Sequence, residues 1–490
     1  MSGRHVLAAL LLVGIPLAVT AQPVSAPQIT PPPPGPARNA ALPAPAERTL
    51  ASGLRVIAFQ QRSAPKAAGV PLIAAQLIVR GGASAESEAE AGLSALTASL
   101  LTQGTTKRSA IEIAQQIDAL GARLDATSGY DASVVSVSAT TPVFAQAFTV
   151  FNEVVRQPAF APAEVERARA KSISDLGLMY SNPSALARLV ANRVVFGGTA
   201  YGHPLAGTAE TLGALTRADV AHFHERYFRP DNAVLVIGGD IAPADAFALA
   251  ERVIGSWSKP AAPLATPAPL TPPAPRPVVL AVDKPDAGRT AVVAGRVAIS
   301  RRSPEYYAGT VATAVLAGYS GRLNQEIRVK RGLSYGASAQ LATRRASGMF
   351  VASTLVDHAK AAEAVDVMLA TLAGVGKTAV DDADLATRKA TVTGGFYRGI
   401  ETIDGIASTL GELALYDVPV GDLTHYVARI NAIAPGDVRR FAQASIASDD
   451  FVVLVGNTKL FADAVRAAHP GLRVIPFAQL DLNRADLEKK

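Results

Sequence analysis

Residues 214–240, "ALTRADVAHFHERYFRPDNAVLVIGGD", align without a gap against residues 432–458, "AIAPGDVRRFAQASIASDDFVVLVGNT". The identical pairs include Asp219 with Asp437, Phe223 with Phe441, Val234 with Val452, and Gly238 with Gly456. Each copy predicts a helix followed by a short strand, because an amphipathic stretch precedes an apolar run rich in β-branched residues. Self-similarity between two distant segments indicates a duplicated domain.

The N-terminal half contains further runs that predict secondary structure. Alternating apolar residues predict strands at 54–60, 72–80, 122–129 and 132–140, and helical periodicity predicts helices at 88–103, 109–122, 141–157 and 161–180. Strands interleaved with helices, without strict alternation, favour an α+β fold with a mixed sheet covered by helices. Because single cores usually stop growing near ~250 to 300 residues, a chain of 490 residues is expected to form two such domains.

Two segments rich in Pro and Ala divide the chain. The first 21 residues combine Arg4 and His5 with an apolar run that is short for a membrane span, and they are expected to be a cleaved signal peptide that directs the protein to the periplasm. Residues 22–47 then form an extended tether, and residues 258–277 form a linker. The expected domains are therefore 48–257 and 278–482.

Composition excludes several kinds of function. The chain has no cysteine, which removes disulfides and thiolate chemistry, and its net charge of +6 is not gathered into a basic stripe for nucleic acid. Its glycine-containing loops lack the spacing of a phosphate loop, and Ser99 and Ser334 have no histidine at a placeable distance for a serine hydrolase. The seven histidines are scattered and are interpreted as structural or surface residues.

Three segments resemble the pitrilysin/insulinase family of zinc peptidases, in its small two-domain bacterial form. Residues 92–105, "GLSALTASLLTQGT", resemble the family helix "GLAHFLEHMLFKGT". Residues 196–241 resemble "PYGHPVLGT…LTRDDLRAFHRRYYRPDNAVLVVAGDI", and residues 317–340 resemble "GSRLFQEIREKRGLAYSV". The resemblance implies two homologous domains, each a mixed, mostly antiparallel sheet covered by helices, in one half of a clam-shaped dimer.

The family helix carries two histidines that bind zinc and a glutamate that deprotonates the metal-bound water. The matching positions here are Ala95, Ala98 and Ser99, and the family's third ligand, a glutamate shortly before an Asn-Pro, falls on Ser174 or Asp175. Methyl and hydroxymethyl groups neither bind zinc nor act as bases. The sequence therefore predicts no metal or other cofactor in this chain, and zinc in a partner subunit.

The family also uses an arginine and a tyrosine, seven positions apart, that reach across a closed chamber to the zinc site. They map onto Arg328 and Tyr335. A phenol can donate a hydrogen bond to the oxyanion of peptide hydrolysis, and a guanidinium can hold a carbonyl or carboxylate. We expect a subunit of a heterodimeric periplasmic metallopeptidase that is inactive alone and supplies this pair in trans to a secreted partner with an intact His-x-x-Glu-His motif. We expect peptide substrates, no nucleic acid and no stable membrane anchor.

The sequence leaves two other interpretations. The chain could be a structural relative without a role in catalysis, as in the mitochondrial respiratory core proteins that share this fold, but a scaffold has no reason to keep Arg328 and Tyr335. An active homodimeric metalloprotease conflicts with the residues at the metal-site positions.

Overall fold

The computed structural model describes residues 42–61, 70–264, 270–273, 278–447 and 451–489, and residues 42–490 belong to one compact unit. The expected signal peptide and most of the tether lie outside the described residues, as does part of the linker. None of the described helices is both long and apolar enough to cross a membrane. The predicted domain boundaries therefore stay predictions.

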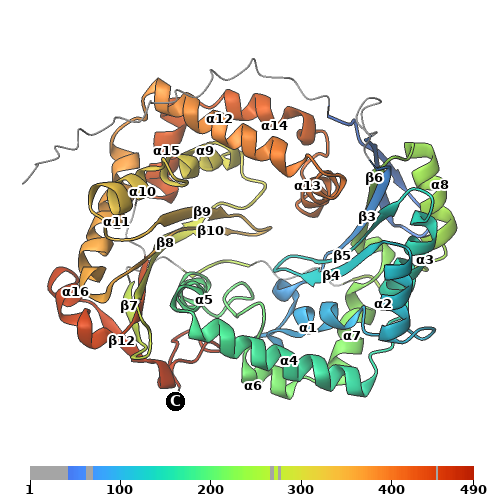
Figure 1. Ribbon diagram of the computed structural model, residues 1–490, viewed down its shortest axis with the longest axis horizontal. Coiled ribbons are helices and arrows are strands. Elements are labelled where there is room, and N and C mark those ends of the chain that lie inside the picture. Colours follow the sequence, from blue (N-terminus) through green and yellow to red (C-terminus); the bar gives the residue numbers. More distant parts are fainter. Residues whose placement is uncertain (1–41, 62–69, 265–269, 274–277, 448–450, 490) are drawn as a thin grey trace, which may run out of the picture. The chain divides into compact units, whose positions relative to one another are not determined.

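The described residues form two six-stranded sheets of related topology (Figure 1). The strand order of the first is β1 (Ala46–Thr49), β2 (Arg55–Gln60), β6 (Ala233–Gly239), β3 (Leu72–Val79), β5 (Ser133–Thr140) and β4 (Arg123–Ser128). The order of the second is β12 (Arg473–Pro476), β7 (Val278–Asp283), β11 (Phe451–Gly456), β8 (Thr290–Ala298), β10 (Gly348–Val356) and β9 (Ala337–Ala342).

The two sheets confirm the α+β class and the internal repeat. The repeated segments form α7 (Arg217–Tyr227) with β6, and α15 (Pro435–Ser445) with β11. Each of these strands lies inside its sheet between one parallel and one antiparallel neighbour, β2 and β3 in the first sheet and β7 and β8 in the second. The other pairings are antiparallel except for β12 with β7, so the sheets are mixed and mostly antiparallel.

Helices cover both faces of each sheet. Those of the N-terminal half are α1 (Leu93–Leu100), α2 (Ala110–Ala119), α3 (Phe144–Arg156), α4 (Pro162–Ser181), α5 (Pro183–Phe196), α6 (Ala209–Ala214), α7 and α8 (Pro243–Ile254). Those of the C-terminal half are α9 (Tyr306–Leu316), α10 (Arg322–Asn324), α11 (Ala361–Lys377), α12 (Asp382–Gly399), α13 (Ile403–Leu415), α14 (Asp422–Asn431), α15 and α16 (Ala462–Ala468).

Short helical turns join several of these elements. They are η1 (Ala83–Ala85), η2 (Glu88–Glu90), η3 (Pro230–Asn232), η4 (Gln325–Lys330), η5 (His358–Lys360), η6 (Thr458–Leu460) and η7 (Phe477–Gln479). The turn η4 is π-helical and the others are 3₁₀ turns. The helix predicted at 88–103 is shorter in the structure, because Gly92 has φ of +95° and so separates η2 from α1.

The two halves exchange one helix each (Figure 1). The strands of each sheet bury side chains on both faces, so each sheet needs a helical layer on either side. On one face of the first sheet, β3 and β6 pack against α13 from the C-terminal half. On one face of the second sheet, β8 and β11 pack against α5 from the N-terminal half. This exchange joins both halves into one compact unit.

Equivalent hairpin loops of the two halves also meet. The turn between β9 and β10 carries Arg344, whose guanidinium carbon lies 3.6 Å from the ring centroid of Tyr130 in the turn between β4 and β5. Arg344 Nη2 donates to Asn192 Oδ1 at 2.7 Å, and the backbone N–H of Arg345 donates to Asp131 at 2.9 Å. The buried guanidinium is thus enclosed by groups from the other half.

Candidate functional site

Helix α1 holds the segment that resembles the family's metal-binding helix, and its side chains pack the core. Its leucines lie in the hydrophobic core, and the helix packs against α4 and α7. Ala98 is buried, Ala95 is half-buried, and Ser99 is exposed with its hydroxyl donating to the Leu96 carbonyl at 2.7 Å. The helix therefore keeps its packing face, while its reactive positions hold small side chains.

The other predicted metal-site positions lie on α4, which packs against α1. Ser174 and Asp175 are both exposed, and Lys171 Nζ lies 2.6 Å from Asp175 Oδ2 in an ion pair one helical turn apart. Among the described residues, no three His, Cys, Asp or Glu side chains lie close enough together to hold a metal ion. The donor groups at these positions do not fit a catalytic zinc, which needs three protein ligands.

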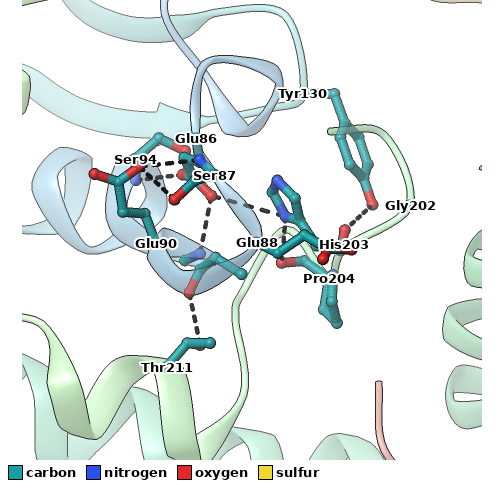
Figure 2. Close-up of polar contacts among 12 residues, drawn as sticks. Glu86, Ser87, Glu88, Glu90, Ser94, Tyr130, Gly202, His203, Pro204 and Thr211 are labelled. Atoms are coloured by element: carbon teal, nitrogen blue, oxygen red, sulfur yellow. Dashed lines mark hydrogen bonds and ion pairs between the residues drawn. The ribbon is translucent and has the colours of Figure 1, made fainter. Parts of the chain in front are cut away.

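The loop before α1 contains a buried acid that the sequence did not single out. Glu86 accepts hydrogen bonds from the backbone N–H groups of Gly92, at 3.0 Å, and Ser94, at 2.6 Å, so its carboxyl caps the start of α1. His203 Nδ1 lies 3.8 Å from Glu86 Oε2, and both side chains are inaccessible to solvent (Figure 2). Tyr130 donates to the His203 carbonyl at 3.2 Å.

Burial disfavours the charged form of both side chains. It raises the pKa of Glu86 to about 7, although the Ser94 and Gly92 N–H groups act in the opposite direction. It also lowers the pKa of His203. Burial thus favours the neutral forms of a carboxyl and an imidazole that lie in neighbouring loops, and Glu86 and His203 are interpreted as structural.

The remaining described histidines have the contacts of structural or surface residues. Two bond to the backbone: His224 Nε2 lies 2.8 Å from the Val155 carbonyl oxygen, and His358 Nε2 lies 3.0 Å from that of Ala287. His469 is paired with Asp366 at 3.2 Å, and His222 and His425 are exposed.

The structure brings Arg328 and Tyr335 together at the surface. Arg328 lies in the π-helical turn η4, and Tyr335 lies in the segment between η4 and β9. The Arg328 guanidinium carbon is 4.6 Å from the centroid of the Tyr335 ring, and Tyr335 is 82% exposed. This contact is favourable as a cation–π interaction, and it leaves the phenol hydroxyl and the guanidinium N–H groups available.

The charges around Arg328 are paired with one another. Glu326 bonds to Lys330 at 2.6 Å and to Arg331 at 2.5 Å, and these bonds lower the pKa of Glu326. Arg322 lies 3.7 Å from Asp384. Among the described residues, no carboxylate or carbonyl accepts a hydrogen bond from Arg328, so its donors remain free for another molecule.

Sequence reasoning missed a third member of this group, Tyr319. The Arg328 guanidinium carbon lies 4.8 Å from the centroid of its ring, and Tyr319 is 72% exposed. No periodicity or motif places Tyr319 beside Arg328, because the intervening residues turn through α10 and η4. The only sequence signal is the position of Tyr319 between Gly318 and Gly321, in a segment that the glycines mark as a loop.

Comparisons with known proteins agree with this architecture. Residues 65–209 match the model of the insulinase family (peptidase family M16), and residues 214–392 match the model described as the peptidase M16 inactive domain. An uncharacterised zinc protease of Mycobacterium leprae is 27% identical over 395 residues, which cover 80% of this chain and 87% of that protein. An uncharacterised zinc protease of Mycobacterium tuberculosis is 26% identical over 414 residues, which cover 83% of this chain and 92% of that protein.

Solved structures share the fold. The crystal structure of a peptidase M16 inactive domain from Pseudomonas fluorescens has a TM-score of 0.77 at 23% identity and covers 84% of this chain and 98% of its own. The crystal structure of a protease from Helicobacter pylori also has a TM-score of 0.77, at 18% identity, and covers 85% of this chain and 99% of its own. With two models of this family matched in succession, over residues 65–209 and 214–392, the chain belongs to the insulinase, or M16, family of peptidases.

Proposed function

We propose that this chain is the zinc-less subunit of a heterodimeric periplasmic metallopeptidase and supplies Arg328 and Tyr335 to the zinc site of its partner. The partner would be a secreted family member with an intact His-x-x-Glu-His motif, and the two would form a clam-shaped dimer. The single observation that carries the proposal is the exposed contact between Arg328 and Tyr335, 4.6 Å apart, with free donors on both side chains.

The chemistry of this pair suits peptide hydrolysis. When water attacks a peptide carbonyl, negative charge develops on the carbonyl oxygen, and a phenol such as Tyr335 can donate a hydrogen bond to it. The guanidinium of Arg328 can hold a second carbonyl or a carboxylate of the same peptide in a fixed position. Both roles depend on groups that no described residue of this chain already binds.

The rest of the chain supports a subunit without its own catalytic site. The positions that bind metal in the family carry methyl and hydroxymethyl groups, or an aspartate paired with Lys171. The match of residues 214–392 to the inactive-domain model supports a non-catalytic M16-like subunit in general. The name zinc protease belongs to the relatives, and among the described residues of this chain no three potential ligands lie together.

The decisive experiment compares Tyr335→Phe with Tyr397→Phe in the assembled complex. The partner is sought as a secreted family member encoded beside this chain or captured from the periplasm. Removing one oxyanion donor is expected to lower kcat by about 100-fold or more. Tyr397 is the control, because its hydroxyl makes no hydrogen bond within the described part of the chain. Wild-type turnover by Tyr335→Phe would refute the donor role and favour the scaffold hypothesis.

A second measurement tests the division of labour between subunits. The isolated chain is expected to bind no stoichiometric zinc, by metal analysis after dialysis, and to cleave no peptide. Tight zinc binding together with chelator-sensitive cleavage by the isolated chain would contradict the proposal.

A further inference from the structure

The surface around Arg328 contains two tyrosines. The Arg328 guanidinium carbon is 4.8 Å from the ring centroid of Tyr319 and 4.6 Å from that of Tyr335. Each ring attracts the cation through its face, and neither uses a guanidinium N–H group. Arg328 is thus restrained by one tyrosine that precedes it in the sequence and one that follows it, while its N–H groups stay free to donate.

The backbone on either side of Tyr319 is held by buried polar side chains. Asn324 Nδ2 donates to the Gly318 carbonyl at 2.8 Å. Arg388 donates to the Ser320 hydroxyl at 3.0 Å and to its carbonyl at 2.9 Å. Asn324 and Arg388 are both buried. These bonds fix the backbone position from which the exposed Tyr319 side chain projects. In a loop without such bonds, the backbone under a tyrosine would sample many conformations.

The same asparagine also fixes the segment of Tyr335. Asn324 Nδ2 donates to the Ala337 carbonyl, and the Ala337 N–H donates to Asn324 Oδ1, both at 2.9 Å. The Ser334 hydroxyl donates to the Leu355 carbonyl at 2.7 Å on β10. Both tyrosine-bearing segments therefore take their position from Asn324, the residue directly before the π-helical turn that carries Arg328.

We infer that Tyr319 is a positioning residue that orients Arg328 toward an oxygen acceptor of the peptide substrate. The inference rests on the proposed function of Arg328 and extends it to a residue that touches no reacting atom. Its ring face is the part that acts, because the contact runs through the ring, and the hydroxyl is not needed. Tyr335 differs, because its hydroxyl is the proposed donor.

The two tyrosines therefore respond differently to the same substitution. In the assembled complex, Tyr319→Leu is expected to raise KM about 2- to 5-fold, the value of one cation–π contact at an exposed site, with little change in kcat. Tyr319→Phe keeps the ring and is expected to retain the wild-type KM. Val329→Ala is the matched control, because it removes apolar surface from an exposed side chain of the same turn.

A double-mutant cycle shows whether Tyr319 acts through Arg328. Arg328→Ala is expected to raise KM by roughly 10-fold or more, the loss of a charge-assisted hydrogen bond. In that background, Tyr319→Leu is expected to have no further effect. An undiminished effect of Tyr319→Leu there, or equal losses in Tyr319→Phe and Tyr319→Leu, would overturn the positioning role.

The outcomes also separate the two proposals. If Arg328→Ala leaves KM and kcat unchanged, the proposed function itself fails. If Arg328→Ala weakens the complex's activity while Tyr319→Leu matches wild type, the proposed function stands and only the role of Tyr319 is refuted. Thermal unfolding of each variant identifies any loss that comes from misfolding.

Discussion

Arg344 gives the sharpest test of how the two halves are joined, and the perturbation is Arg344→Ala. The guanidinium carbon lies 3.6 Å from the ring centroid of Tyr130, 4.6 Å from that of Phe196 and 4.8 Å from that of Tyr201. All three rings belong to the N-terminal half, whereas Arg344 follows β9 in the C-terminal half. Burial lowers the pKa of the guanidinium, but an arginine remains charged at neutral pH.

The cost of the substitution follows from these contacts. A desolvated cation–π contact is worth about 2 kcal/mol. Asn192 Oδ1 loses its donor, at 2.7 Å, and an unsatisfied buried acceptor costs about 1 to 3 kcal/mol. The Tyr201 carbonyl keeps a donor, because Asn192 Nδ2 also bonds to it at 2.6 Å. Relief from burying a cation offsets part of the sum, so we expect a net loss of about 3 kcal/mol.

The assay is equilibrium unfolding in urea, followed by far-UV circular dichroism, on the chain as it is expressed. Arg302→Ala is the control, because Arg302 is exposed and such surface changes usually fall within about 0.5 kcal/mol. A loss below about 1 kcal/mol in Arg344→Ala, or one equal to that of Arg302→Ala, would refute the contribution assigned to this cluster.

Two further predictions concern buried polar groups. Burial raises the folded-state pKa of Glu86 from 4.5 to about 7, so the folded protein binds this proton more tightly than the unfolded chain does. As the pH rises from 4.5 to 7, ionisation of Glu86 therefore lowers the free energy of unfolding by up to about 3 kcal/mol. Urea unfolding from pH 4.5 to 8 should therefore show the stability of Glu86→Gln rising relative to wild type by about that amount. Parallel pH profiles of the two proteins would contradict this prediction. Asn324→Ala removes the hydrogen bonds to Gly318 and Ala337 and should lower the free energy of unfolding by about 2 to 4 kcal/mol. The control is Ser338→Ala, at an exposed position, which should change the free energy of unfolding little. Equal urea midpoints for the two variants would show that Asn324 does not fix the tyrosine segments.

Local pattern was enough to predict most helices and strands of the N-terminal half, and α15 and β11 of the C-terminal half. The strands expected at 54–60, 72–80, 122–129 and 132–140 agree with β2, β3, β4 and β5 to within one residue at each end. The helix expected at 161–180 is α4, with Pro162 at its first position. The helix expected at 88–103 was too long, because a positive φ at Gly92 interrupts it. Alternation and helical periodicity are read over a few residues, whereas one backbone dihedral angle is not visible in them.

The candidate site was only partly predictable. The spacing of Arg328 and Tyr335 and the small residues at 95, 98 and 99 are visible in the sequence, together with their resemblance to the family. Tyr319, Asn324 and Arg388 were missed. Their relation to Arg328 runs through hydrogen bonds from buried side chains to carbonyl groups, and main-chain carbonyls leave no mark on the sequence pattern.

The sequence by itself determined the α+β class, the duplication and the small side chains at 95, 98 and 99, because these depend on residue type and short-range periodicity. Only the tertiary structure decided that α5 and α13 are exchanged between the sheets, and that Glu86 pairs with His203. It alone placed Arg344 against Asn192, 152 positions away. Such contacts depend on which apolar faces remain uncovered once both sheets have formed, and no local pattern specifies the segment that covers them.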